Sequence, residues 1–537
     1  MRTGPARWSF MAKAGAMALL IAVADLFFFE HEPGWTLGLF AGLWLLGLVA
    51  VVPAVRRNRA AWVAVVAAAA MAFVLVEAPG PLPVLLFGIA LTLAALLPRR
   101  RFDDAFSWAV RLVLQGIFGL TRPGGDLLRL LRLPRRKDRT SLRSLAVMLA
   151  LPVGGSALFL ALFSNANPLI SDALASVRVP DPTGLMFHMV LWAVILFMVW
   201  PSLRPHPRVT LLPTMLRGGW TGPEPAIASI TLSLVAFNLI FALQNGLDIV
   251  FLWSGARLPG TLTLADYAHR GAYTLIATAL FAGLFVLVLL RPRGAAARSP
   301  GLRGLVTLWV AQNLLLVASS MLRTLDYVEA YSLTVLRLAA LLWMGLVALG
   351  LVLICWRLLA GRSARWLVNA NAAVAALVLL VSAGVDFRAT AAEWNVRHAR
   401  EAGGPGQPID LCYLNGLGSS ALLPVIDFER GVKAPAVRDR AAWVRSELLA
   451  RLEKEQADWH SWSWRNARRL AAARALEGPG WVQPEKASWG RECDGTVRLP
   501  PPAPQPPVAE NASAAPANTT ATESSGNAAG ALDAQRR

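Results

Sequence analysis

Residues 322–337, LRTLDYVEAYSLTVLR, place four charged side chains within a few helical turns, between two long apolar runs. Arg323 and Asp326 are three residues apart and can pair on one helical face. Arg337 falls inside an apolar run, where a lone charge costs several kcal/mol, so we expect it to have an acidic partner. The candidates for that partner are Glu329, Asp248 and Asp266.

The chemistry open to such a group takes two forms. Its members can form a salt-bridge network that locks helical hairpins together, or an outward-facing site for an ion, a lipid headgroup or an envelope precursor. In an enzyme, Asp248, His269 or Glu329 would act as general acid or base. The full candidate polar cluster comprises Gln244, Asn245, Asp248, Asp266, His269, Arg270, Arg323, Asp326, Glu329 and Arg337.

Amide side chains also occur near the middle of the apolar runs, at Asn238, Gln312 and Asn313. Such residues usually hydrogen-bond neighbouring helices, for about 0.6–2 kcal/mol each, whereas in a transporter they line the conduction path. The sequence is compatible with both interhelical hydrogen bonding and a conduction path.

The composition shows what must position these residues. Of 537 residues 55% are hydrophobic and only 16% are charged, which is more apolar surface than one soluble core absorbs. The net charge of +19 and the 20 Trp fit a membrane protein, because Lys and Arg collect in cytoplasmic loops and Trp at the interfaces. No repeated aromatic and basic platform indicates nucleic-acid binding, so the lipid bilayer is the expected partner.

Eleven apolar runs have about the length that a helix needs to cross the hydrocarbon core. The sequence therefore predicts an all-α polytopic membrane protein, with spans 1 to 4 in residues 1–98 and spans 5 to 11 in residues 144–384. The predicted spans are 14–29, 35–55, 61–77, 82–98, 144–163, 185–203, 226–250, 271–290, 304–322, 332–356 and 366–384.

Basic residues predict the orientation, because short loops rich in Lys and Arg stay in the cytoplasm. They precede the first span and then follow every second one, which places the N-terminus inside and the C-terminus outside a bacterial inner membrane. Residues 99–143 are densely basic, with apolar residues at helical spacing. This segment is either an amphipathic helix in contact with anionic lipids or a solvated loop that only fixes topology.

After Gly384 the long apolar runs stop, and charged residues, Gly and Pro appear. We expect residues 385–494 to form a small periplasmic domain and residues 495–537, rich in Pro, Ala, Ser and Thr, to be a disordered tail. In that compartment Cys412 and Cys493 can form a disulfide, if their Cα atoms come close enough.

Three signatures of soluble chemistry are weak or missing. Gly416–Ala421 fits a loose dinucleotide pattern after a potential strand at Ile409–Leu414, but the segment is too short for a doubly wound fold, and a turn into a helix is simpler. There is no phosphate-binding loop and no zinc-like His and Cys spacing, so we expect no cofactor and no metal. The Trp cluster at Trp459–Trp464 is interpreted as a core or docking face.

Several spaced motifs occur in one order along the second half of the chain. They are Gln244-Asn245 with Asp248, Leu258-Pro259, Tyr267 with His269-Arg270-Gly271, Asp326-Tyr327 with Glu329-Ala330-Tyr331, Leu333-Thr334 with Arg337, and Asp386, Glu393-Trp394-Asn395, Asp410 and Tyr413-Leu414. This arrangement resembles a bacterial family of polytopic membrane proteins of unknown function, DUF4173/DUF4153-like. Ser332 stands where that family usually has Gly, and Trp394 where it usually has Tyr. The resemblance implies an integral-membrane fold and no established activity.

Two functions remain from the sequence. We favour a non-enzymatic inner-membrane protein, transporter-like, sensory or scaffolding, whose outward-facing cluster meets a periplasmic ligand or a membrane-protein partner. The alternative is a membrane-embedded transferase that acts on a lipid-linked substrate.

Overall fold

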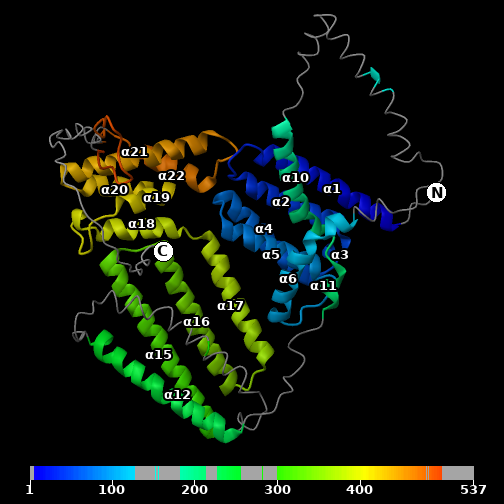
Figure 1. Cartoon of the computed structure of the whole chain (residues 1–537), viewed down its shortest axis with the longest axis horizontal. Coiled ribbons are helices and arrows are strands. Elements are labelled where there is room, and N and C mark those ends of the chain that lie inside the picture. Colours follow the sequence, from blue (N-terminus) through cyan, green and yellow to red (C-terminus); the bar gives the residue numbers. More distant parts are fainter. Residues whose placement is uncertain are drawn as a thin grey trace, which may run out of the picture.

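A computed structural model describes residues 5–126, 152, 155–156, 182–212, 226–254, 281, 299–478, 481 and 483–498 (Figure 1). Within these ranges the named elements are all helices, and β pairing is limited to one bridge between Arg491 and Val497. The predicted all-α fold is confirmed. The potential strand at Ile409–Leu414 is wrong, because α19 (Leu411–Gly416) begins there, with the Asp410 carboxylate accepting from the Tyr413 N–H as an N-cap.

Seven helices in the described part of the chain are long and apolar enough to cross a membrane. Helices α2 (Thr36–Val51) and α5 (Pro81–Leu96) also coincide with predicted spans but have only 16 residues each. The predicted spans 144–163 and 271–290 fall almost wholly outside the described residues, so the count of eleven stays a prediction. The seven helical segments are Ser9–Phe28, Arg59–Glu77, Thr183–Leu211, Ile227–Trp253, Pro300–Tyr331, Val335–Leu359 and Ala364–Gly384.

The N-terminal helices pack into one bundle around a continuous apolar core that includes Leu48, Leu75 and Leu91. Small residues such as Ala61, Ala68 and Ala94 are buried there, which lets the helices approach closely. The bundle consists of α1 (Pro5–Phe28), α2, α3 (Pro53–Arg56), α4 (Arg59–Glu77), α5, α6 (Ala105–Leu120), α10 (Pro182–Leu203) and α11 (Pro207–Leu211).

Helix α6 lies within the predicted amphipathic segment and buries its polar face. Arg111 and Gln115 are buried, with Arg111 paired to Asp103 at 2.7 Å and Gln115 donating to the Pro201 carbonyl at 3.0 Å. The apolar face points outward, with Val113 and Ile117 more than half exposed. Such a helix suits the edge of a bilayer, with its apolar face turned to lipid.

A second helical group follows, with its own apolar core. Helix α12 (Ile227–Asp248) continues into the π-helical turn η2 (Ile249–Trp253) and packs on α15 (Pro300–Tyr331), which packs on α16 (Val335–Leu359). Helix α17 (Ala364–Gly384) contacts α16 on one side and α4, α5 and α6 on the other. It therefore joins the two groups, as Figure 1 shows.

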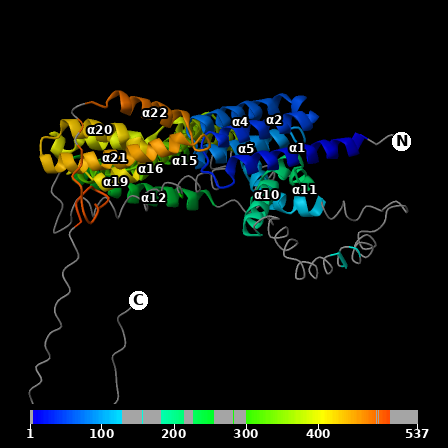
Figure 2. The ribbon, with the colours of Figure 1, turned by 90° about the horizontal axis from the view of Figure 1, so that it is seen from above.

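Residues 386–476 form what we call the C-terminal cluster. Its helices enclose a separate apolar core around Leu414, Val425 and Leu448, and the structure joins Cys412 to Cys493 by a disulfide with the Cα atoms 4.9 Å apart. The cluster lies across one end of both helical groups (Figures 1 and 2). It comprises α18 (Phe387–His398), η3 (Arg400–Ala402), α19, η4 (Gly418–Ala421), α20 (Leu422–Gly431), α21 (Pro435–Ala457) and α22 (Trp464–Ala475).

The Trp-rich turn between α21 and α22 docks on the loop between α1 and α2. The Gly34 N–H donates to the His460 carbonyl at 2.8 Å, and the Trp35 N–H donates to the Trp462 carbonyl at 2.7 Å. Near this junction, Arg468 pairs with Glu77 at 2.7 Å. The docking-face interpretation of the Trp cluster agrees with these contacts.

Gly34 leaves no room for a side chain at this junction. A Cβ atom there would come within 2.4 Å of the Ser461 carbonyl carbon and the Trp462 oxygen. We expect Gly34→Ala to lower the free energy of unfolding by about 1–3 kcal/mol, because the backbones must separate. Thermal unfolding in detergent measures the loss.

The matched control is Gly42→Ala on α2, where a Cβ meets nothing within 4 Å. A helical Gly→Ala change in open space is neutral or stabilising by up to about 1 kcal/mol. Equal stability of the two variants would contradict the tight docking of Gly34.

Candidate functional site

A buried ion pair joins α12 to α15. Arg323 of α15 pairs with Asp248 of α12, and both side chains are almost fully buried. Gln244, one turn before Asp248, donates from Nε2 to the same carboxylate oxygen at 3.0 Å. The expected pairing of Arg323 with Asp326 on its own helix is not the one found, because a buried guanidinium is best neutralised by a carboxylate that is equally buried, and Asp326 is only half-buried.

A ladder of amide hydrogen bonds continues this pair along α12 and α15. Gln312 donates to the Asn238 side-chain oxygen at 2.9 Å, Asn238 donates to the Leu305 carbonyl at 3.1 Å, and Asn245 donates to the Gln312 carbonyl at 3.1 Å. Asn313 instead donates to Trp309 of its own helix at 2.7 Å. We call the ion pair and this ladder the polar seam.

Three amide oxygens in and beside the polar seam accept no hydrogen bond in the described structure. Among the described residues, the buried side-chain oxygens of Asn245, Gln312 and Asn313 have no hydrogen-bond partner. An unpaired buried acceptor costs about 1–3 kcal/mol, so these three groups are expensive if their only role is to hold helices together.

Arg337 lies apart from the polar seam, at the turn between α15 and α16. Its guanidinium donates to the Tyr331 carbonyl at 2.7 Å and to the Ser332 carbonyl, and it lies 4.4 Å from the centre of the Tyr327 ring. Its partners in the described structure are thus backbone carbonyls at the C-terminus of α15, where the helix dipole favours a cation. The prediction that Glu329 or Asp248 pairs with Arg337 was therefore wrong.

The same turn is held by the C-terminal cluster. The Asn395 side chain accepts from the Leu333 N–H at 2.7 Å and donates to the Leu333 carbonyl at 3.0 Å. The Tyr413 hydroxyl accepts from the Val335 N–H at 3.0 Å. We call these contacts the turn clasp.

Ser332, inside the turn clasp, has a backbone conformation with φ 69° and ψ 166°. This region is accessible to Gly and costs other residues about 1–3 kcal/mol. Gly would adopt this conformation without that cost.

The predicted ten-residue cluster is therefore divided. Gln244, Asn245, Asp248 and Arg323 belong to the polar seam, and Arg337 lies at the turn that the turn clasp holds. Asp326 is half-buried and Glu329 is exposed near the end of α15. Asp266, His269 and Arg270 lie outside the described residues.

The family described as a domain of unknown function, DUF4153, matches residues 16–428. The chain belongs to this family. The DUF4153 region covers most of the N-terminal bundle, the polar seam, the turn clasp, α18, α19 and most of α20. Searches of curated proteins and of solved structures found no match.

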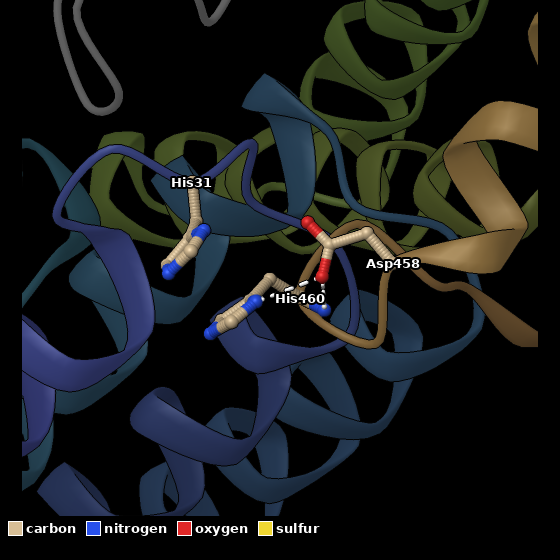
Figure 3. A group of neighbouring side chains, drawn as sticks. All are labelled: His31, Asp458 and His460. Carbon is tan, nitrogen blue, oxygen red and sulfur yellow. Dashed lines mark hydrogen bonds and ion pairs between the residues drawn. The ribbon is translucent and has the colours of Figure 1, made fainter.

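Sequence reasoning missed one group of side chains in this DUF4153 protein, at the docking junction (Figure 3). Ligand atoms of His31, Asp458 and His460 lie within 4.8 Å of one another and could hold a metal ion. However, the two imidazole rings stack in nearly parallel planes with centroids 3.5 Å apart, so their in-plane lone pairs do not converge. His31 and His460 are 429 positions apart in the chain, so no sequence motif could indicate their contact.

Asp458 accepts hydrogen bonds from the backbone N–H and the imidazole of His460. The backbone N–H and then the imidazole of His460 hold the pKa of this exposed carboxyl below its usual value. One turn earlier, burial and then the charge of Glu32 raise the pKa of Glu455. The junction as it stands works as a packing contact between the N-terminal bundle and the C-terminal cluster.

The Asp248–Arg323 pair predicts a stability effect. Asp248→Asn removes the carboxylate that pairs with the buried Arg323 guanidinium, so we expect it to destabilise the protein by about 3–5 kcal/mol, whereas Asp248→Leu combined with Arg323→Met recovers most of the loss. Thermal unfolding of the purified variants measures both. Glu393→Gln, at the exposed pair with Arg397, is the control and changes stability by less than about 0.5 kcal/mol.

The conformation of Ser332 predicts a gain. We expect Ser332→Gly to stabilise the protein by about 1 kcal/mol, because Gly relieves the strain but adds freedom to the unfolded chain. Ser332→Ala keeps the Cβ and serves as the control. If Ala stabilises as much as Gly, the side-chain hydroxyl rather than the backbone conformation is the cause.

Proposed function

We propose that this protein is a non-enzymatic sensory or scaffold component of the bacterial inner membrane, in which the C-terminal cluster, on the periplasmic side, sets the position of the α15–α16 hairpin. The turn clasp carries this proposal. An amide that both donates to and accepts from one residue of the turn fixes its orientation as well as its distance.

The strain at Ser332 fits the same role. Unfavourable backbone conformations persist where surrounding contacts enforce them, and they concentrate at switch regions. Release of Asn395 from Leu333 would let the turn relax, so the state of the C-terminal cluster would be passed to two membrane-spanning helices. A sensor needs such a two-state element.

The distribution of charge and sulfur supports the proposed orientation. Arg56 and Arg204 lie at the ends of α3 and α10, away from the C-terminal cluster, which suits the cytoplasmic side. The Cys412–Cys493 disulfide suits an oxidising compartment such as the periplasm.

A carrier is the second candidate, and the three buried oxygens of Asn245, Gln312 and Asn313 favour it. Amide oxygens without hydrogen-bond partners are suitable ligands for a hard cation. The transferase alternative gains less support, because Asp248, one of its proposed acid–base groups, is fully buried and paired with Arg323.

Hydrogen–deuterium exchange on the full chain in nanodiscs tests the turn clasp. Reduction of Cys412–Cys493 loosens the C-terminal cluster, so in the wild type we expect faster exchange at residues 332–336 as well as in the cluster. In Asn395→Ala the turn already exchanges at least about tenfold faster, since a lost 1.4 kcal/mol is a tenfold change in opening. Reduction then adds nothing at the turn.

Asn371→Ala is the matched control, because Asn371 donates to Leu367 of its own helix. If the turn exchanges alike in wild type and Asn395→Ala, the turn clasp does not couple the two parts and the proposal fails. Cation flux in proteoliposomes that Gln312→Leu abolishes would instead establish the carrier.

A further inference from the structure

A pocket of about 360 Å³ opens at the basic end of the N-terminal bundle, remote from the polar seam and the turn clasp. Four cationic side chains line it, and they come from four different segments: α1, the turn after α5, the helical residues 122–126 that follow α6, and the end of α10. They are Lys13, Arg99, Arg122 and Arg204, together with Pro205, Pro207 and Thr210.

One carboxylate organises two of these cations. The buried Asp126 forms ion pairs with Arg204 at 3.1 Å and with Arg122 at 3.4 Å, and it accepts a hydrogen bond from the Trp200 indole N–H at 3.0 Å. Arg99 is held from another side, donating to the Pro205 carbonyl at 3.3 Å. The arginines are thus positioned by the fold rather than spread in solvent.

The charge balance of the pocket is strongly positive. Four cations line the pocket, and none of the lining residues in the described part of the chain is acidic. Like charges that line one pocket repel one another. An anion in the pocket would offset the repulsion among the four cationic side chains.

We propose that this pocket binds a phosphate group, and that the headgroup of an anionic phospholipid supplies it. Arginine guanidinium groups match phosphate oxygens in geometry and charge. Basic pockets between membrane helices on the cytoplasmic side commonly hold lipid headgroups. The volume exceeds what a bare phosphate needs and lies in the range of small-molecule sites.

The surroundings of the pocket favour a lipid over a soluble phosphate. Beside Lys13, Met11 of α1 is 64% exposed, and Phe10 lies under the Arg204 guanidinium with 5.1 Å between the guanidinium carbon and the ring centre. The apolar face of α6 is also turned outward. Acyl chains could therefore run along α1 while the phosphate stays among the cations.

Thermal unfolding of the full chain in mixed micelles tests the proposal, with dioleoylphosphatidylglycerol compared with dioleoylphosphatidylcholine. We expect the phosphatidylglycerol to raise the melting temperature of the wild type. Lys13→Gln and Arg99→Gln each weaken its apparent affinity about tenfold, because each removes one charge-assisted contact. Neither residue pairs with Asp126 in the described structure, so the pocket keeps its two organised arginines.

Arg56→Gln and Arg57→Gln are the controls, since both are exposed at the same end of the bundle and outside the pocket. Loss of affinity in the controls equal to that in the pocket variants would reduce the effect to general surface charge and overturn the proposal. So would equal stabilisation by the two lipids, combined with no effect of the soluble phosphate described next.

Glycerol 1-phosphate without lipid identifies the source. If it raises the melting temperature and loses this effect in Lys13→Gln and Arg99→Gln, while phosphatidylglycerol has none, the phosphate site stands and its ligand is soluble. If only phosphatidylglycerol acts, the lipid assignment stands.

Discussion

A polar group among membrane helices has no water to pair with, so its partners must come from the protein itself. This constraint determines where α12, α15 and α16 can lie. Asp248 cannot be buried unless Arg323 of the facing helix meets it, and the carbonyls that end α15 are satisfied by Arg337 one turn into the next helix. Apolar packing supplies contact area, but Leu against Leu tolerates sliding along the helix axis. The hydrogen bonds of the polar seam fix the register.

The C-terminal cluster extends the same constraint beyond the spanning helices. The turn between α15 and α16 exposes the N–H and carbonyl of Leu333, and Asn395 pairs with both. At the other helical group, Gly34 and Trp35 pair with the backbone of residues 460–462. The cluster thus completes the unsatisfied backbone at the ends of two helical groups. Its place in the fold follows from those hydrogen bonds as much as from its own core.

Much of the fold could be predicted from the sequence, because apolar length and helical period are local signals. The nine predicted spans that fall on described residues all coincide with helices. The site was harder to predict, because the pairing of charged residues depends on how the helices are rotated relative to each other. Arg323 and Asp326 have good spacing along one helix, yet Arg323 faces α12, and the sequence could not show which face would be buried. Arg337 was expected to need a carboxylate because carbonyl partners are invisible in a sequence.

The docking junction also dictates an order of assembly. Trp35 and Thr36 bond to residues that lie 424 positions later in the chain. Ribosomes add about 5–20 residues per second, so roughly 20 to 85 seconds pass between synthesis of the two halves of that contact. During this interval Gly34 and Trp35 lack the hydrogen-bond partners that they have in the folded protein. The contact between the N-terminal bundle and the C-terminal cluster can therefore form only after most of the chain has been synthesised.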